Sequence, residues 1–506
     1  MPSALSLKTS YIQTWSRTNE WDARGDYFIT AGVIAISIAP LVWLFPALAH
    51  WFLFPVIACG VLAGVEVVRW LRGGLDLFDP RTIVGCLALY GFFVAPILHV
   101  IWNRFGAGYD LILWNDWRPW LGAMAALNAG GLIAYRLTQR WAYRRASTSS
   151  SKWEIAPRRF YPALMLVLIA SAAGVTAYLW QMGGVLGEMT AFETDRAAYV
   201  GTGWLLILAW PLAVLCFILV TFAWTQQQDH KGRLMTAMIL LGVVGAGHFF
   251  LMGWYGSRSA TIWALFWMAG IIHYRFRALS PRVTAAGAIL LIGFMYFYGF
   301  YKERGRAAVE ILKTPAMWMD PTGYERDLKG LLLDDLARAD SNAFILRNLV
   351  KEPDDYDYRW GLTYAGAFAV LIPKPLWPDR PEFKVEAGTE AQFGKATFLR
   401  SSRVYGLPGE ALLNFGPFGV VPIFAVYGAV MGLYRRKLSS WDIDDARMFL
   451  APLFTMWFAN AFVSDSDNLV YAIVIQGTLV LAAFLVATKR RPVPRTVGVR
   501  ARSDYR

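Results

Sequence analysis

Apolar segments of about twenty residues recur along the chain and are separated by polar joints; clear examples cover residues 28–48, 205–224, 283–300 and 468–488. A run of about twenty apolar residues wound as an α-helix matches the thickness of the hydrocarbon core of a bilayer. Inside hydrocarbon only helices and closed barrels satisfy their own backbone hydrogen bonds, and these runs do not alternate apolar with polar residues. The pattern predicts an all-α polytopic membrane protein.

Taken in order, the apolar segments predict about twelve transmembrane helices. They cover residues 28–48, 51–70, 82–102, 120–137, 160–179, 204–224, 234–252, 260–274, 283–300, 416–434, 448–463 and 468–488. We therefore divide the chain into an N-terminal tail (1–27), nine helices (28–300), one large loop (301–415), three helices (416–488) and a basic tail (489–506). The first helix follows a polar tail without a cleavable signal, so we expect it to act as an uncleaved signal-anchor.

Charge sets the orientation that we expect. Both tails and the joints 69–81, 136–159, 225–233, 274–282 and 434–447 hold 29 of the 49 Lys and Arg residues, whereas the short joints on the other side hold four. The positive-inside rule then places both termini in the cytoplasm and the large loop outside. The net charge of +13 is thus a topology signal and does not indicate nucleic acid as a partner. With 56% hydrophobic and only 17% charged residues, the chain is not an ordinary soluble protein.

The large extracytoplasmic loop mixes 16 basic with 17 acidic residues, and loops of such length are usually functional. Leucine and other apolar residues recur at helical spacing over 324–350, which predicts short amphipathic helices. The apolar stretch 361–372 is too short to cross a bilayer and ends in a run of prolines, so we expect an interfacial or re-entrant helix. Trp377, within the proline run, is expected at the level of the lipid headgroups.

Two features inside the apolar segments have structural interpretations. Glu66 interrupts the second predicted helix, and we expect it to form an ion pair with Arg69, one turn away. The three cysteines lie in apolar segments and are predicted to be packed thiols, with no disulfide framework.

Cations gather at the outward ends of the predicted helices, where the positive-inside rule disfavours them. The planar fork of arginine suits phosphate oxygens and its charge does not titrate. One interpretation is a diphosphate-binding site; the other is contact with lipid headgroups or structural ion pairing, for example with Glu303. Arg258 is the strongest candidate, because its joint is too short to be merely a surface loop. The candidate residues are Arg196, Arg258, Lys302, Arg304, Arg400 and Arg403.

The segment 399–416 is the densest motif. Glycines and Pro408 form a constrained turn, and Glu410 and Asn414, four residues apart, share one face of a helix that leads into the membrane. A carboxylate beside an apolar surface can have a raised pKa and act as a general base. The alternative is a carboxylate that stabilises a helix N-terminus.

Other candidates are His248, Asp465 and Asp467. His248 is either a buried, hydrogen-bonded histidine or a proton acceptor. The two aspartates form a short acidic motif that is more often a solvated turn or a helix cap than a metal site. The five histidines lack metal-ligand spacing, so no metal is expected.

Several short motifs occur in a consistent order between the third and the tenth predicted helices. They are Asp79-Pro-Arg81, Gly183-Gly184 with Arg196 and Gly201-Thr-Gly203, Gly256-Ser-Arg258, the proline-rich stretch 372–381, and Gly409-Glu410 with Asn414-Phe-Gly416. In this order and topology the chain resembles the bacterial O-antigen and exopolysaccharide repeat-unit polymerases, the Wzy-type family.

The resemblance implies a GT-C-like glycosyltransferase of the bacterial inner membrane with its active site facing the periplasm. Its substrate would be an undecaprenyl-diphosphate-linked oligosaccharide, with no cofactor, and its partners would be membrane lipids and a chain-length regulator protein. Glu410 would be the catalytic base, with His248 as a second catalytic candidate, and the cations above would hold the diphosphate. Asn414, Trp377 and Tyr405 would contact the acceptor glycan.

Three other functions stay open. An O-antigen ligase would transfer the glycan to lipid A–core, but its outward histidine base is missing, because residues 301–415 contain no histidine. A polysaccharide or lipid transporter would need charges along a path through the helices, where Glu66 is almost alone. A structural subunit of an envelope complex would not explain the clustering of cations.

Overall fold

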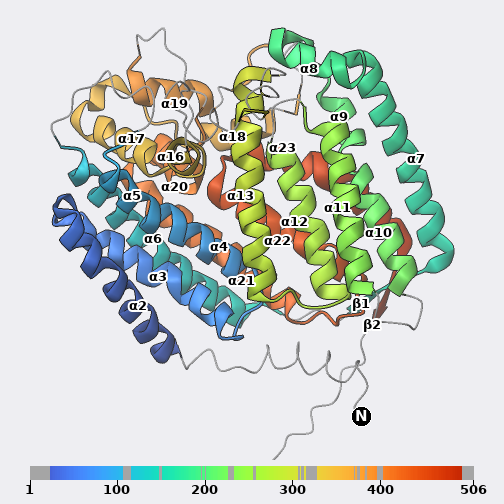
Figure 1. The fold of residues 1–506 in the computed structure, drawn as a ribbon, viewed down its shortest axis with the longest axis horizontal. Coiled ribbons are helices and arrows are strands. Elements are labelled where there is room, and N and C mark those ends of the chain that lie inside the picture. Colours follow the sequence, from blue (N-terminus) through green and yellow to red (C-terminus); the bar gives the residue numbers. More distant parts are fainter. Residues whose placement is uncertain are drawn as a thin grey trace, which may run out of the picture.

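The computed structural model is helical apart from two short strands (Figure 1). It describes residues 23–105, 116–147, 151–194, 196–199, 201–225, 233–254, 258–305, 308, 313–314, 328–369, 371–372, 376–381, 384–395 and 403–492.

Among these residues, nine helices are long and apolar enough to cross a membrane. This is the composition of a multi-pass, all-α membrane protein. Three of the nine contain a helix junction or a short π-helical turn within the apolar stretch. They are α2 (Ala23–Leu44), α3 (Leu53–Leu71), α4–η2–α5 (Pro80–Leu89, Tyr90–Val94, Ala95–Ile101), α7 (Pro157–Met182), α9–α10 (Gly203–Ala209, Leu212–Thr225), α11 (Arg233–Met252), α13 (Pro281–Arg304), α21 (Pro417–Leu438) and α23–η9–α24 (Ser466–Ala472, Ile473–Gly477, Thr478–Ala487).

The other three predicted spans also fall on helices: α6 (Arg118–Arg145), α12 (Arg258–Arg275) and α22 (Ala451–Val463). Helix α22 has only 13 residues. Helix α6 has 28 residues but buries Asn128, Arg136 and Gln139 against its neighbours. The total of twelve transmembrane helices therefore stays a prediction.

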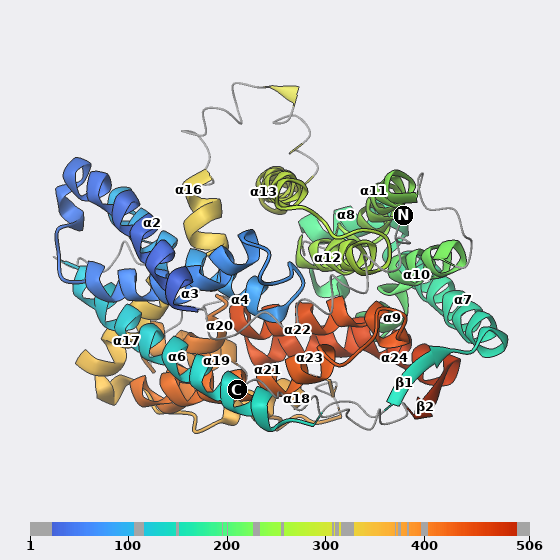
Figure 2. The ribbon, with the colours of Figure 1, turned by 90° about the horizontal axis from the view of Figure 1, so that it is seen from below.

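The helices form two cores. One lies between α2, α3, α4, α6 and α21, and the other between α7, α9, α10, α11, α12, α22 and α24. The C-terminal helices, which contribute to both groups, lie where the two groups meet (Figure 2). Helices α6 and α21 approach closely because α21 presents glycine to α6: a Cβ added at Gly428 would lie 2.3 Å from the carbonyl oxygen of Tyr135. Small residues permit such close packing in membranes.

Several polar joints meet at one end of the bundle. Strand β1 (Ser151–Ile155) pairs antiparallel with β2 (Thr488–Pro492). Arg447, in the short helix η8 (Ala446–Phe449), donates to the carbonyl oxygen of Ser151 at 2.7 Å. Arg275 donates to the carbonyl oxygen of Ile443 at 2.8 Å. We call this end of the bundle the strand end.

The opposite end carries the large loop and is called the loop end (Figure 1). Within the described residues, the loop is mainly helical, as expected over 324–350 and 361–372. Its short helices pack on one another and on the bundle: α16 (Leu328–Gly330), η6 (Leu331–Asp335), α17 (Ala339–Lys351), η7 (Pro353–Asp355), α18 (Leu362–Ala369), α19 (Lys384–Phe393) and α20 (Gly406–Phe415). The remaining short elements are η1 (Pro46–Leu48), α8 (Gly184–Thr194) and η3 (Arg196–Tyr199).

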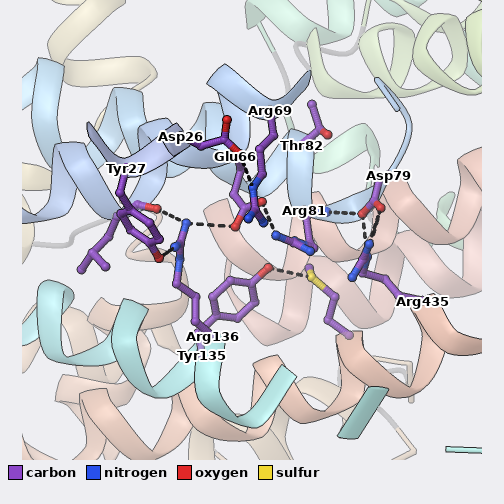
Figure 3. A network of polar contacts seen from close by, with 12 residues as sticks. Asp26, Tyr27, Glu66, Arg69, Asp79, Arg81, Thr82, Tyr135, Arg136 and Arg435 are labelled. Atoms are coloured by element: carbon purple, nitrogen blue, oxygen red, sulfur yellow. Dashed lines mark hydrogen bonds and ion pairs between the residues drawn. The ribbon is translucent and has the colours of Figure 1, made fainter. Parts of the chain in front are cut away.

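Glu66 lies in a buried network of ion pairs near the strand end (Figure 3). Arg81 donates to its carboxylate at 2.5 Å and Arg136 at 2.9 Å. The predicted ion pair between Glu66 and Arg69 is wrong, because Arg69 donates instead to Asp26 at 3.1 Å. The reason is that α3 directs Glu66 toward α4 and α6, whereas Arg69 faces α2. The cysteines Cys59, Cys86 and Cys216 are free thiols.

Glu66→Gln removes the negative charge between two buried guanidinium groups. Breaking a buried ion pair from one side typically costs about 3–5 kcal/mol, so we expect a clear loss of thermal stability in detergent. Glu154→Gln is the control, since Glu154 pairs with the exposed Arg491 between the two strands and surface pairs contribute little. Equal melting temperatures for Glu66→Gln and wild type would contradict a stabilising role for this network.

Candidate functional site

Glu410 lies at the loop end in a buried pocket formed by three elements. Its side chain is 3% exposed. The Thr363 hydroxyl of α18 donates to Oε1 at 2.8 Å, and the Ser466 backbone N–H donates to Oε2 at 2.7 Å. The Ser466 hydroxyl donates to Oε1 at 2.5 Å. The carboxylate thus joins α18, α20 and the start of α23.

The pKa of Glu410 is raised to about 7, first by burial and then by the nearby charge of Asp465, whereas the hydrogen bonds from Ser466 and Thr363 limit the rise. The expected raised pKa is therefore present. The Glu410 carboxylate also accepts a hydrogen bond from the first backbone N–H of α23. Both interpretations therefore apply: a carboxylate with a raised pKa and a carboxylate that stabilises a helix N-terminus. The helix whose N-terminus it contacts is α23 and not its own helix, in which it is the fifth residue.

Asn414 shares the face of Glu410, as expected from the spacing. Its amide nitrogen donates to the Thr363 hydroxyl at 2.6 Å and to the Glu410 carbonyl oxygen at 2.9 Å. Its amide oxygen accepts from the backbone N–H of Gly361 at 2.9 Å. Asn414 is fully buried and holds the start of α18 over Glu410. It therefore positions Thr363.

Asp465 is fully buried and stands at the N-cap position of α23, although its side chain makes no capping hydrogen bond. Of the two expected alternatives, the solvated turn is therefore wrong for this residue and the helix-cap position is confirmed. Lys384 of α19 forms an ion pair with it, and the backbone N–H groups of Tyr405 and Gly406 donate to its Oδ1, each at 2.9 Å. Lys384 also lies 3.6 Å from Asp467. The single positive charge of Lys384 balances the negative charge of Asp465, which explains why the Asp465 carboxylate can be buried. Among the residues that the structure describes, no group of three His, Cys, Asp or Glu residues could hold a metal ion.

Tyr405 belongs to the same buried cluster and is 0% exposed. Gln392 donates to its hydroxyl at 2.6 Å, and Asn342 donates to its carbonyl oxygen at 3.2 Å. The ring therefore packs inside the protein, and Tyr405 supports the site from behind without reaching a surface where a glycan would bind.

The arginines expected to hold a diphosphate are in ion pairs. Arg258 donates to Asp335 at 3.0 Å, and Arg403 donates to Asp340 at 3.4 Å. Both carboxylates come from the segment formed by η6 and α17. The alternative interpretation, structural ion pairing, thus applies to both arginines in the ligand-free protein.

The remaining expected cations are less informative. Lys302 is exposed near the end of α13. Arg196 begins η3 and Arg304 ends α13, but their side chains lie outside the described residues, as does all of Arg400.

Arg338 is a further cation of the site, and it was not predicted from the sequence. Its Nη1 donates to the carbonyl oxygens of Asp335 and Ala337, at 2.8 and 2.6 Å, and its buried Nε has no acceptor in the described part of the chain. Burial lowers its pKa, and the charges of Asp465 and Asp340 oppose this shift. Arg338 is therefore close enough to Asp465 and to the paired arginines, Arg258 and Arg403, to be influenced by their charges. Its position among three aspartates in 334–340 was the signal that could have identified it.

A cavity of about 390 Å³ adjoins this cluster on the α18 side. Thr363, which donates to Glu410, lines it together with Trp377 and Asp379, and Arg359 forms part of its wall. Trp377 is 39% exposed, so its ring is available to a ligand in the cavity. Indole rings offer flat apolar surfaces with one polar group, which suits the faces of sugar rings.

His248 lies elsewhere. It is buried in α11 and packs edge-on against Trp210, with ring centroids 5.6 Å apart. Helices α11 and α20 lie in different parts of the molecule in both views (Figures 1 and 2). The structure therefore does not bring His248 together with Glu410.

Comparison with known proteins returned no match among family models, curated proteins or solved structures. The site therefore has to be interpreted from its own geometry. It combines a buried carboxyl group with a pKa of about 7, the nearby arginines described above, and an adjoining cavity with the exposed indole of Trp377.

The raised pKa of Glu410 predicts how stability depends on pH. Between its usual pKa of 4.5 and its folded pKa of about 7, the folded protein binds more protons than the unfolded chain. Stability linked to Glu410 is therefore complete below pH 4.5 and is lost as the pH rises through 7, by about 3 kcal/mol in total. Wild type should lose more thermal stability than Glu410→Gln between pH 5 and pH 8.

Glu386→Gln is the control for this measurement, because Glu386 is an exposed carboxylate on the neighbouring helix α19. It should keep the wild-type pH dependence. Parallel pH profiles for wild type and Glu410→Gln would show that Glu410 titrates normally.

Proposed function

We propose that this protein is a membrane glycosyltransferase that polymerises oligosaccharide repeat units linked to a polyprenyl diphosphate, as in O-antigen or exopolysaccharide synthesis. The observation that supports this proposal best is the environment of Glu410, a buried carboxylate with a pKa of about 7 beside a cavity. A general base works best when its pKa lies near the operating pH. The family resemblance of the short motifs agrees with this role.

In the proposed reaction, the acceptor hydroxyl of one repeat unit attacks the anomeric carbon of another. A bond forms between the acceptor oxygen and that carbon, and the bond from the carbon to the diphosphate oxygen breaks. Glu410 takes the hydroxyl proton, and polyprenyl diphosphate leaves with the electron pair. The acceptor sugar enters through the cavity beside Thr363 and stacks on Trp377.

The leaving diphosphate needs positive charge, which arginines supply effectively. Arg338 is the first candidate, because its Nε lacks an acceptor among the described residues and it lies near both Asp465 and Asp340. Arg258 and Arg403 join it by exchanging their carboxylate partners for phosphate oxygens. Lys384 remains with Asp465 and holds the site in shape.

The proposal includes a topology. Twelve helices would span the bacterial inner membrane, with the strand end in the cytoplasm and the loop end in the periplasm. This orientation follows from the excess of Lys and Arg in the joints of the strand end. Membrane lipids and a chain-length regulator protein would be the partners at the loop end.

Glu410→Gln keeps the size of the side chain and removes its basicity. A general base contributes about a hundred- to ten-thousandfold in rate, so the purified variant should bind lipid-linked repeat units and accumulate single units without polymer. The measurement is the product ladder formed in detergent from defined lipid-linked substrate, with thermal unfolding in parallel. Near-normal turnover by a folded Glu410→Gln protein would remove Glu410 as the base.

Arg338→Lys keeps a positive charge but loses the planar fork that binds two phosphate oxygens. We expect a decrease in polymerisation rate of about a hundredfold, the usual effect of losing one donor to a developing anion. Arg347→Lys is the matched control in α17, the helix that Arg338 directly precedes; Arg347 pairs there with the exposed Glu352. If both variants polymerise alike, Arg338 does not contact the diphosphate.

A further inference from the structure

A second cavity lies at the strand end, far along the bundle from Glu410. It has a volume of about 80 Å³ and is enclosed by the α3–α4 joint, the end of α12 and the end of α21. A single water molecule occupies about 30 Å³ in the liquid, so the cavity has room for more than one. Asp79, Tyr143, Tyr274, Arg435 and Trp441 contribute to its wall.

Three of these residues carry buried hydrogen-bonding groups without a partner among the residues that the structure describes: Arg435 Nη1, the Tyr274 hydroxyl and Trp441 Nε1. Tyr274 and Trp441 are each more than nine-tenths buried. Guanidinium and indole nitrogens can only donate. Because buried donors are nearly always satisfied, whatever fills the cavity must supply acceptor atoms.

The charge around the cavity restricts the ligand further. Arg435 uses Nε and Nη2 for the carboxylate of Asp79, with distances of 2.7–3.0 Å, so these two charges cancel (Figure 3). The nearby Asp76 is likewise occupied by His273 at 2.5 Å. Arg436 lies over the ring of Tyr143, 5.4 Å from its centroid, and pairs with no carboxylate among the described residues. Because Tyr143 lines the cavity, this cation without a carboxylate partner in the described part of the chain lies beside it.

We propose that this cavity binds a phosphate group, with Trp441, Tyr274 and Arg435 donating to its oxygens. A phosphate group offers several acceptor oxygens to these donors, and its negative charge suits a cavity with Arg436 stacked on one wall residue. A phospholipid headgroup and inorganic phosphate share this chemistry. The site is distinct from the Glu410 cluster and does not depend on the function proposed for it.

Trp441→Phe and Tyr274→Phe test the proposal, because each removes one donor and keeps an aromatic ring. Thermal unfolding of the delipidated full-length protein is measured with added phosphatidylglycerol, with inorganic phosphate, and with diacylglycerol, which lacks the phosphate. A ligand that binds only the folded state raises the melting temperature. We expect phosphate-containing probes to raise it by about 2 °C or more in wild type, and by less than half as much in the variants.

Tyr434→Phe is the control, because the Tyr434 hydroxyl donates to the carbonyl oxygen of Ala451 and not to the cavity. It should keep the full shift. A shift with phosphatidylglycerol alone identifies a lipid headgroup, and a shift with inorganic phosphate identifies a free anion; both support the site. No shift in wild type, or the same shift in wild type and both Phe variants, would overturn it and leave water as the occupant.

Native mass spectrometry gives a second readout that does not require the variants to be as stable as wild type. Wild type released from phosphatidylglycerol micelles should retain one lipid that the Trp441→Phe and Tyr274→Phe double variant loses. Retention by both proteins would assign the bound lipid to another surface and overturn the proposal.

Discussion

A charged side chain inside an apolar helical bundle is stable only when the protein itself supplies its counter-charge and hydrogen bonds, because removing an unpaired charge from water is very costly. Three such arrangements tie this fold together: Glu66 with Arg81 and Arg136, Asp79 with Arg435, and Asp465 with Lys384. Each joins elements far apart in sequence. These ion pairs therefore also hold helices together that are distant in the sequence.

At the loop end, this requirement creates the chemistry of the candidate site. Asp465 is neutralised by Lys384, whereas Glu410, a short distance away, receives only hydrogen bonds from neutral donors and the backbone. Two carboxyl groups in one buried cluster thus acquire different properties. The group without a cation is the one that can exchange a proton near neutral pH.

The close contact between α6 and α21 gives this cluster a rigid support. Gly428 lets the two backbones meet, and α20 runs directly into α21 through Gly416, whose φ of 65° lies in the region that favours glycine. Glu410 is thereby placed at the top of a packed helix pair. The last turn of the same α21 carries Arg435, which lines the second cavity, so one helix connects the two sites that we propose.

The order of apolar and polar segments determined the helical membrane fold, because the length of an apolar run and the spacing of residues on a helix are local properties. For the same reason, the shared face of Glu410 and Asn414 was visible in the sequence. The partners of Glu66, the burial of Asp465 and the importance of Arg338 were not. Arg81 lies 15 residues from Glu66 and Arg136 lies 70, while Lys384 lies 81 residues from Asp465. Which of these residues pair depends on how the helices pack. Only the tertiary structure therefore decided which charged groups form ion pairs, which are buried, and which are left for the chemistry of the candidate site.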